Sequence, residues 1–480
     1  MTTIQEQRGF PFQENEMRDL CRCGGSPATA VAARRSTAAY AKMLERTPEF
    51  QQWRDNAHEI KRYAITHWDQ WLVLFEKNLQ AKGIEVLWAE DATEANRLIV
   101  EIAKKHDVRK VVKSKSLVTE ELQLNRALKK NGIEPIETDL GEYLLQLAEQ
   151  RPTHTVVPAL HLTAEDCGRL FEKKLGEPFT AVPEELTAIA RKHLREHFLT
   201  ADMGVSGVNF GIADTGSFAV IENEGNAGLS TSTPPVHVAV MGIEKVIPSV
   251  DYLPQFLHVL PRSATDQKLT TYTHLFHGPT PGRKMYVVLV DNGRTRVLQQ
   301  PETVSTLFCI RCGACMNACP VYHRVGGWAY GWIYPGPIGE VLNPHLVGME
   351  KAGKLPFASS LCEKCAQVCP VKVAIPEQLV YLRNQATQTA SPMRSWYQAM
   401  LWKTWRFFNV RAARYRFLMG CVRCGTRVVP WIPKALHLLE LRAWTQGRAI
   451  PQPSGEPFRQ WWRRHQKDLS KQNREERGSK

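Results

Sequence analysis

Residues 309–320 read CIRCGACMNACP, and residues 362–370 read CEKCAQVCP. The first stretch has the spacing C-x2-C-x2-C-x3-C-P, which is typical of bacterial ferredoxins. In that pattern three cysteines hold one cubane cluster and the fourth reaches a second cluster. The second stretch, C-x2-C-x3-C-P, has the same ending with one cysteine fewer. Together the two stretches predict a domain that binds two iron–sulfur clusters.

Crossed ligation assigns each cysteine to a cluster. Cluster one takes Cys309, Cys312, Cys315 and Cys369, and cluster two takes Cys319, Cys362 and Cys365. Cluster two then lacks a fourth thiolate, because Ser359 stands where a full repeat would have a cysteine. Ser359, another side chain, water or a partner subunit can complete the set, or the second cluster has three irons. Zinc fits poorly, since its sites use C-x2-C pairs that total four ligands.

The totals allow two or three domains in 480 residues, of which 43% are hydrophobic. The N-terminus has no basic segment followed by an apolar one, and no run of about 18 uncharged apolar residues occurs anywhere. We therefore expect a cytoplasmic protein. In a reducing compartment, clustered cysteines more often bind metal than form disulfides.

Predicted strands and helices alternate between residues 84 and 159. The strands are expected at 84–88, 108–112, 133–138 and 154–159, and the helices at 92–105, 118–130 and 141–150. This alternation predicts an α/β fold with a mostly parallel sheet. Shorter strands with glycine turns follow, at 218–221, 236–241 and 285–290.

Changes in composition suggest five regions. They are a helical region at 1–69, an α/β domain at 70–300, the two-cluster domain at 301–385, basic Trp-rich helices at 386–445 and a poorly ordered tail at 446–480. A segment between the two cysteine stretches, GGWAYGWIYPGPIGEVLNP (326–344), either covers the clusters against water or is an ordinary packed insertion.

Polar motifs in the α/β domain each allow two readings. Residues 113–116 (KSKS) follow a predicted strand, where ligands of such sheets bind. The two lysines suit an anion there, whereas Ser116 is expected to cap the next helix. His237 is interpreted as a core histidine, and Glu244 with Lys245 as a candidate catalytic pair of an isomerase-like site. The polar turns at 215–217 and 222–226 either admit a ligand or only form hairpins. No G-x-G-x-x-G fingerprint indicates a dinucleotide site.

The formal net charge of +14 is concentrated near the C-terminus. Residues 401–439 contain eight Lys or Arg, no Asp or Glu, and several aromatic residues among them. This mixture favours an amphipathic helix on a partner or a membrane surface over binding to nucleic acid. Cys421 and Cys424 are free thiols, form a redox pair, or bind metal together with Cys21 and Cys23. Cys167 is expected to be structural.

Four stretches carry a family resemblance. They are VVKSKSLVTEELQLNRALKKNGIEPIETDLGEYLLQLA (111–148), IADTGSFAVIENEGNAGLSTSTPPVHVAVMGIEK (212–245), FCIRCGACMNACPVYHRVGGWAYGWIYPGPIGEVLNP (308–344) and SSLCEKCAQVCPVKV (359–373). In content and order the chain resembles the lactate utilization protein B family over nearly all of residues 30–385.

The resemblance implies more than the spacing does. The α/β region would be an LUD domain, with a fold like that of ribose-phosphate isomerases and CoA transferases, and both clusters would be [4Fe-4S]. The partners would be a subunit with cysteine-rich motifs and a small LUD-domain subunit. The absent eighth cysteine at Ser359 matches the family.

The leading hypothesis is an iron–sulfur electron-transfer subunit of a complex that oxidises L-lactate to pyruvate, so that lactate serves as a carbon source. Such a chain is a component of an oxidoreductase, located in the cytoplasm with a peripheral contact at the inner membrane surface through 401–439. The alternative is an LUD-domain enzyme that acts on a sugar phosphate or acyl-CoA and has structural clusters. A third hypothesis is a regulator that binds nucleic acid through 401–439.

Overall fold

The computed structural model describes residues 27–388, 392–428 and 456–478. The chain divides into two units, one that ends at Thr389 and one that begins at Ala390. Each unit is described by itself.

The described N-terminal part of the first unit is helical from Pro27 onward, and residues 1–26 of the helical region expected at 1–69 lie outside the described residues. Its helices are α3 (Pro27–Arg46), α4 (Phe50–Thr66) and α5 (Trp68–Ala81). Buried residues in α4, such as Phe50, Ala57 and Ala64, recur at helical spacing and pack into the core. Gly83, at φ 79°, leads the chain into the first strand.

The α/β domain is built on a six-stranded sheet in which all neighbouring strands are parallel. In spatial order the strands are β1 (Glu85–Ala89), β10 (Lys284–Val290), β7 (Val236–Gly242), β4 (Met203–Gly207), β2 (Lys110–Lys113) and β3 (Glu134–Glu137). Parallel neighbours require crossover connections, which explains the non-sequential order. The predicted α/β class with a parallel sheet is confirmed.

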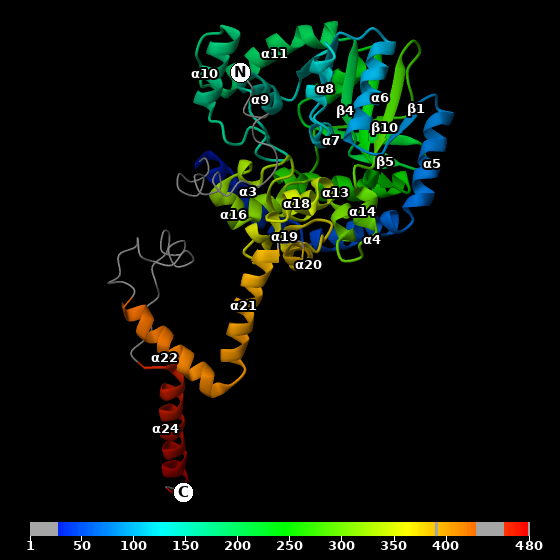
Figure 1. The fold of residues 1–480 in the computed structure, drawn as a ribbon. Helices are drawn as coiled ribbons and strands as arrows, with labels where there is room; N and C mark the ends of the chain where they lie inside the picture. Colours follow the sequence, from blue (N-terminus) through cyan, green and yellow to red (C-terminus); the bar gives the residue numbers. More distant parts are fainter. Residues whose placement is uncertain (1–26, 389–391, 429–455, 479–480) are drawn as a thin grey trace. The chain divides into compact units, whose positions relative to one another are not determined.

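Helices connect the parallel strands. They are α6 (Ala92–Lys105), α7 (Leu117–Glu121), α8 (Leu124–Lys130), α9 (Leu140–Ala148), α10 (Ala164–Leu175) and α11 (Pro183–Thr200). Helix α6 has the predicted bounds, with Asp91 as its cap, and it lies across the sheet in Figure 1.

Two predictions in this region were wrong. The single helix expected at 118–130 is broken at Gln123, whose φ is 55°. The break lets Leu122 and Leu124, two positions apart, enter the same core cluster, which a continuous helix would prevent. The strand expected at 154–159 is a loop, because the His154 ring accepts the N–H groups of Val156 and Val157 (3.0 and 3.1 Å).

The two faces of the large sheet bury different partners. Val238, Val240 and Val288 pack with α6 and α8 on one face. The alternate residues, such as Met241 and Leu289, pack on the other face with α5 and a second sheet. The α/β domain therefore has layers on both faces of its central sheet.

The second sheet has the order β8-β5-β6-β9. Its strands are β5 (Phe210–Ile212), β6 (Ser217–Glu222), β8 (Val246–Ile247) and β9 (Tyr272–Phe276). The domain is completed by α12 (Asn226–Ser232), η1 (Ile243–Lys245), η2 (Val250–Tyr252), α13 (Leu253–Thr265) and α14 (Arg294–Leu298). The turn at 215–217 is the hairpin between β5 and β6, where Gly216 packs against Asn78.

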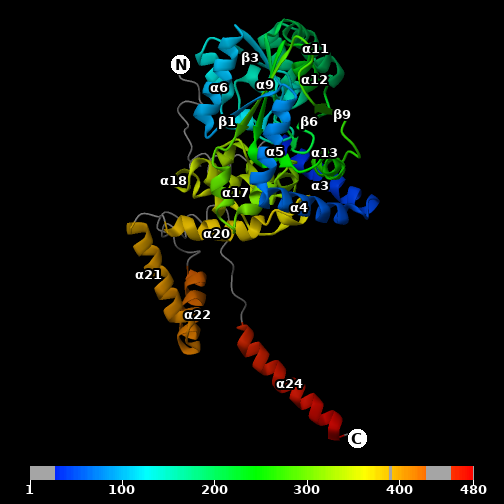
Figure 2. The same cartoon turned by 90° about the vertical axis from the view of Figure 1, so that its right-hand side faces the viewer.

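The cysteine domain consists of short helices. They are η3 (Val304–Phe308), α15 (Ala314–Ala318), α16 (Pro320–Val325), η4 (Trp328–Tyr330), α17 (Gly336–Val347), α18 (Met349–Ala352), η5 (Leu355–Ala358), α19 (Lys364–Val368) and α20 (Ile375–Gln388). Residues 336–346 of α17 are all buried, so the aromatic and Gly-rich insertion is a packed core element of this domain. Figure 2 shows α17 and α20 in the layer beside the sheets.

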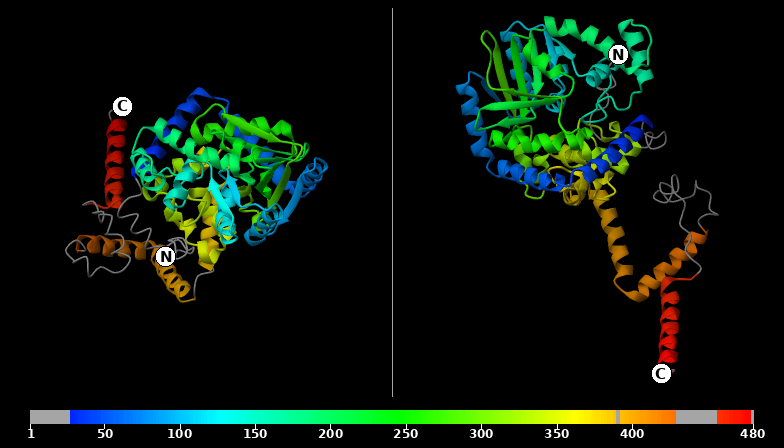
Figure 3. Two further views of the ribbon diagram at one scale, coloured as in Figure 1. Left: turned by 90° about the horizontal axis from the view of Figure 1, so that it is seen from above. Right: turned by 180° about the vertical axis from the view of Figure 1, so that it is seen from behind.

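Helices α3 and α4 contact the cysteine domain, and Figure 3 shows them running along it. Thr37 of α3 donates a hydrogen bond to the carbonyl of Asn317 (2.7 Å). Arg54 of α4 donates to the carbonyls of Ala366 (3.2 Å) and Cys369 (2.9 Å). Segments that are far apart in the sequence thus fix the positions of both cysteine stretches.

The second unit contains α21 (Pro392–Asn409), α22 (Ala412–Val428) and α24 (Phe458–Gly478). Helix α24 differs from the poorly ordered tail expected at 446–480, because its Arg, Gln, Lys and Glu residues favour a helix. The rest of that expectation, at 446–455 and 479–480, lies outside the described residues. None of the described helices is long and apolar enough to cross a membrane.

Candidate functional site

The first cysteine stretch begins in a loop and ends between two short helices. Cys309 and Cys312 lie between η3 and α15, with Arg311 at φ 63°. Cys315 lies in α15, and Cys319 precedes Pro320, the first residue of α16. Proline suits that position because the first N–H of a helix has no partner to lose. Cys319 thus lies at the junction of α15 and α16, and it is absent from the cavity that the three cysteines before it line.

Four cysteines line one small cavity. They are Cys309, Cys312, Cys315 and Cys369. The other lining residues are largely apolar and include Ile310, Ile338 and Val373. This is the set that the sequence predicts for cluster one. Four thiols around an apolar cavity suit a cubane cluster, although the ligation itself stays a prediction.

Backbone N–H groups point at two of these sulfur atoms. The N–H of Arg311 donates to Cys309 Sγ (3.4 Å), and that of Val373 donates to Cys369 Sγ (3.3 Å). Burial raises the pKa of the Cys369 thiol to about 11. It also raises the pKa of the Cys312 and Cys315 thiols, so these groups stay protonated at neutral pH until a metal replaces the proton.

The remaining three cysteines of the two stretches are less enclosed as a set. Cys319 and Cys365 are buried, whereas Cys362 is exposed. Burial, together with the neighbouring Glu340 and Cys362, raises the pKa of the Cys319 thiol to about 11 and that of the Cys365 thiol to about 12. The three predicted ligands of cluster two therefore lie in one neighbourhood.

Glu340 of α17 belongs to the same neighbourhood, and sequence reasoning missed it. It is fully buried, and neither carboxylate oxygen has a hydrogen-bond partner among the described residues. Burial raises the pKa of its carboxyl to about 8. A buried carboxylate without a partner is costly and needs an explanation. The only signal in the sequence was an acidic residue within the apolar run GPIGEVL.

Ser359, unlike Glu340, has hydrogen-bond partners. Its Oγ accepts the N–H of Leu361 (3.2 Å) in a local turn, and its carbonyl accepts a hydrogen bond from Arg383 (2.9 Å). Its hydroxyl is thus already used within the loop that leads to Cys362.

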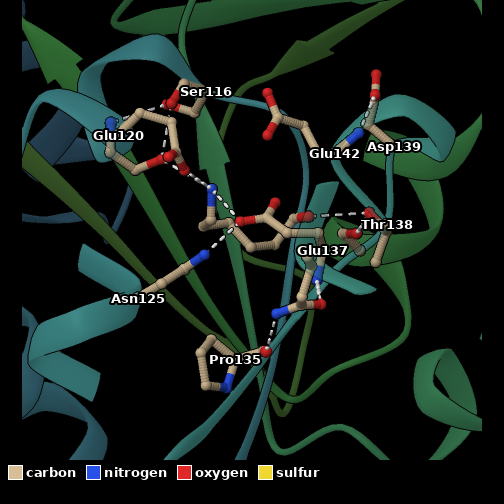
Figure 4. A network of polar contacts seen from close by, with 12 residues as sticks. Ser116, Glu120, Asn125, Pro135, Glu137, Thr138, Asp139 and Glu142 are labelled. Carbon is tan, nitrogen blue, oxygen red and sulfur yellow. Dashed lines mark hydrogen bonds and ion pairs between the residues drawn. The ribbon is translucent and has the colours of Figure 1, made fainter. Parts of the chain in front are cut away.

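Lys113 does not form the anion site that the KSKS motif suggested. Its ammonium group contacts Glu120 (2.9 Å) and Glu137 (2.8 Å). Figure 4 shows these two glutamates within a network of polar contacts. The Lys113 side chain is 1% exposed, and its Nζ also donates to Thr119 (3.2 Å). Burial raises the pKa of Glu137 to about 7, against the effect of Lys113. These charges satisfy one another and leave Lys113 no free face for a ligand.

The other predictions for this motif have separate outcomes. Ser116 caps α7, since its side chain accepts the N–H of Thr119 (3.4 Å), and this prediction is confirmed. Lys115 instead faces a cavity. His237 is a core histidine as predicted, 2% exposed and hydrogen-bonded to Ser206 (2.9 Å).

A cavity of about 280 Å³ opens at the carboxyl ends of β2, β4 and β7. Lys115 and Lys245 line it together with Arg311 of the cluster-one loop. Ligands of parallel sheets bind at this edge. The polar turn at 222–226 also lines it, so this turn borders the cavity rather than a second hairpin.

Glu244 and Lys245 have different surroundings. Glu244 is paired with Arg294 (2.5 Å) and Arg311 (3.3 Å). Although burial opposes it, these cations lower the pKa of Glu244 to about 2. Burial and the nearby Arg311 lower the pKa of Lys245 to about 8. Glu244 is therefore a structural counter-charge, whereas Lys245 lines the cavity without an ion-pair partner among the described residues.

The weaker cysteine signals lie elsewhere. Cys421 and Cys424 are exposed on α22 of the second unit, and Cys21 and Cys23 lie outside the described residues. Cys167 is half-buried in α10, where burial raises the pKa of its thiol to about 11. An inert packed thiol fits the structural role predicted for it.

Family models match three successive parts of the chain. They are the LUD domain at residues 72–297, the 4Fe-4S dicluster domain at 305–373 and the C-terminal region of lactate utilisation protein B at 383–467. The fold and these matches define an iron–sulfur protein in which an LUD domain is joined to a 4Fe-4S dicluster domain.

Similar proteins of almost the same extent are known. Lactate utilization protein B of Shouchella clausii is 41% identical, over 87% of this chain and 89% of its own, and that of Macrococcus caseolyticus is 40% identical, over 92% of each. The uncharacterized electron transport protein YkgF of Escherichia coli is 37% identical, over 92% of this chain and 93% of its own. A solved duf162 family protein from Deinococcus radiodurans matches 46% of the chain with a TM-score of 0.25 and 14% identity. The chain belongs to the lactate utilization protein B family.

Proposed function

We propose that this chain is the iron–sulfur electron-transfer subunit of a complex that oxidises L-lactate to pyruvate, so that lactate serves as a carbon source. The observation that carries the proposal is the meeting of Cys369 with the distant cysteines at 309–315 around one cavity. The names of the relatives support the substrate and the electron-transfer role. In this role the chain is a component of an oxidoreductase rather than a complete enzyme.

The proposed ligands follow the crossed pattern. Cys309, Cys312, Cys315 and Cys369 hold cluster one, and Cys319, Cys362, Cys365 and Glu340 hold cluster two. A bound [4Fe-4S] cluster supplies one-electron transfer at a potential that its surroundings set. The chain's own residues exclude water and direct N–H groups at the sulfur atoms. Helix α17 serves both sites, since Ile338 lines the cluster-one cavity and Glu340 lies near the cluster-two cysteines.

Glu340 is proposed as the fourth ligand of cluster two on the strength of its surroundings. Its two carboxylate oxygens are the buried acceptors without partners beside a set of three thiols. Coordination of iron would explain why an unpaired carboxylate is kept in the core. Ser359 is a poorer ligand, because its hydroxyl already closes a turn.

The proposed partners are a subunit with cysteine-rich motifs and a small LUD-domain subunit. The complex, assembled and purified without oxygen, tests the main proposal. L-lactate is expected to bleach the visible absorbance of the clusters, and an external acceptor should restore it. If L-lactate never reduces the clusters in the assembled complex, the proposed substrate is wrong.

A peripheral contact with the membrane is proposed for the basic stretch at 401–439, of which 429–439 lie outside the described residues. Exposed aromatic side chains on α21, such as Trp402 (66% exposed) and Trp405 (57% exposed), accompany its basic residues. Such helices bind anionic lipid surfaces. The holo-protein should sediment with vesicles that contain anionic lipid, and Trp402→Ala/Trp405→Ala should weaken this. Equal sedimentation with neutral vesicles would contradict the electrostatic part.

The alternative enzyme, acting on a sugar phosphate or acyl-CoA, has less support. Lys113 is enclosed by two carboxylates, and Glu244 is held by Arg294 and Arg311. Two of the four residues considered for that chemistry, Lys113, Lys115, Glu244 and Lys245, are therefore committed to internal ion pairs. Lys115 and Lys245 remain, and they border the cavity at the edge of the sheet.

A further inference from the structure

The cavity at the carboxyl edge of the six-stranded sheet is unusual in its polar groups. Four polar groups that line it lack a hydrogen-bond partner among the described residues. Within the described part of the chain, Ser114 Oγ, Thr155 Oγ1 and Arg311 Nη1 are buried without a hydrogen bond, and Lys245 Nζ has no hydrogen-bond or ion-pair partner. All four residues line the same cavity. Buried polar groups normally find partners, so this convergence indicates a site for a polar ligand.

The four groups come from separate elements. Ser114 follows β2, Lys245 follows β7 in η1, Thr155 lies in the loop after α9, and Arg311 lies in the cluster-one loop. The Arg311 side chain is only 9% exposed and is held in place by Glu244 (3.3 Å) and by the ring of Tyr334 (4.8 Å). The site is therefore built by the fold and does not depend on one flexible loop.

Charge selects the kind of ligand. Lys245 and Arg311 provide two cations, and Lys115 donates to the carbonyl of Val156 while its ammonium keeps further N–H groups. Glu244 does not cancel them, because Arg294 already neutralises it. Three further carboxylates, those of Asp139, Glu222 and Glu224, also line the cavity. Glu222 is bound by His274 (2.6 Å) and by the N–H groups of Ala227 and Gly228 (2.8 Å each). Asp139 accepts the N–H of Glu142 (3.1 Å), and Glu224 accepts that of Leu140 (3.0 Å).

We propose that this cavity binds a small organic acid, with its carboxylate between Lys245 and Arg311 and its other oxygen near Thr155 and Ser114. A guanidinium and an ammonium group together suit a carboxylate, and hydroxyl groups suit the oxygen on the neighbouring carbon. A volume of about 280 Å³ is sufficient for an acid of a few carbon atoms.

The site also adjoins cluster one. Thr155, Ile310 and Arg311 line both this cavity and the cavity of the four cysteines. A bound carboxylate would partly neutralise Arg311 and oppose the extra negative charge of a reduced cluster. Binding should therefore lower the reduction potential of cluster one. This part of the inference rests on the proposed function, because it requires cluster one to be present.

Calorimetry on the anaerobically purified holo-protein tests the site directly. The probes are L-lactate, pyruvate, inorganic phosphate and ribose 5-phosphate. We expect saturable binding of L-lactate or pyruvate and no comparable binding of the two phosphates. Binding of the phosphates alone, or of no probe, would overturn the proposal.

Variants locate the binding. Lys245→Gln should weaken binding roughly tenfold, because it removes a charge-assisted hydrogen bond. Thr155→Val should weaken it less, and it preserves the packing because valine has the shape of threonine. Lys104→Gln, at an exposed lysine of α6, is the matched control and should change nothing. If both Lys245→Gln and Thr155→Val bind as the unmodified protein does, the ligand lies elsewhere.

A redox titration followed by EPR separates this inference from the proposed function. L-lactate or pyruvate at saturation should lower the potential of cluster one and leave that of cluster two nearly unchanged. Binding in calorimetry with an unchanged potential of cluster one would overturn the placement beside that cluster. Absence of clusters from the purified protein would instead contradict the proposed function, while calorimetry would still decide whether the cavity binds an acid.

Discussion

The surroundings of the two predicted clusters differ in enclosure and in ligands. The cluster-one set has four cysteines around an apolar cavity, with backbone N–H groups on Cys309 and Cys369. The cluster-two set has three cysteines, one of them exposed, and a buried carboxylate without partners. The same short motif, a cysteine followed by proline, ends both stretches. The second stretch has one cysteine fewer, and the packing of α17 buries Glu340 near the set that lacks a fourth thiolate, so motif and packing together make the two sites unequal.

This difference suggests that the two clusters have different roles in electron transfer. An enclosed cluster with N–H groups on its sulfur atoms is protected from solvent and tuned by the protein. A cluster with an exposed ligand lies where electrons can leave to a partner. In the proposed complex, cluster one would adjoin the organic-acid cavity and cluster two would face the next carrier.

Removal of a crossed ligand should have the largest effect. Cys369→Ser is expected to abolish cluster one and to remove about half of the bound iron, although Cys369 lies in the second stretch. Cys319→Ser should abolish cluster two, although Cys319 lies in the first. Iron analysis and EPR of the reduced proteins check both, with Cys167→Ser as the control. Loss of the other cluster in either variant would break the crossed assignment.

Much of this arrangement could be predicted from the sequence, and the limits have physical causes. Cysteine spacing is local, so it was enough to predict that Cys369 meets the first stretch, and the structure places it in one cavity with Cys309, Cys312 and Cys315. The crossed ligation itself stays a prediction. Helical periodicity placed α6 correctly. Glu340 could not be found this way, because its role depends on which residues α17 packs against.

The wrong predictions come from side-chain contacts that residue composition does not reveal. Residues 154–159 have the composition of a strand, but the His154 ring takes up two of their N–H groups and turns them into a loop. The KSKS motif suggested that Lys113 binds an anion, because the motif follows a predicted strand. Glu137, which pairs with Lys113 instead, is adjacent to it only in the folded chain. The cavity of Lys245 and Arg311 joins elements that are 66 positions apart in the sequence (311 − 245), and no local pattern announces it.

Replacement of Glu340 should have the next largest effect, and this effect should be confined to cluster two. Glu340→Ala is expected to convert cluster two into a three-iron cluster, because one iron loses its protein ligand. The EPR signal of an oxidised three-iron species should then appear, with cluster one unchanged. Glu377→Ala, at an exposed glutamate of α20, is the control. If Ser359→Ala produces the three-iron signal and Glu340→Ala does not, Ser359 is the ligand instead.

On exposure to air, the two clusters should be lost at different rates. Oxidants reach cluster two more easily because Cys362 is exposed, so its EPR signal should decay first and that of cluster one should persist. A time course of EPR spectra under limited oxygen measures both decays in one sample. Equal decay rates, or earlier loss of cluster one, would contradict the inequality in solvent access.

The smallest expected effect concerns the charge beside cluster one. Arg311→Gln removes a buried cation next to Cys309, and this cation favours the more negative, reduced cluster. The reduction potential of cluster one should fall by an amount on the order of tens of millivolts, while that of cluster two stays constant. Glu244 keeps Arg294 as its partner (2.5 Å), so the variant leaves no unpaired buried charge. A redox titration that finds both potentials shifted equally would show that Arg311 acts on the whole domain, and the two sites would then be electrostatically less separate than their cavities are.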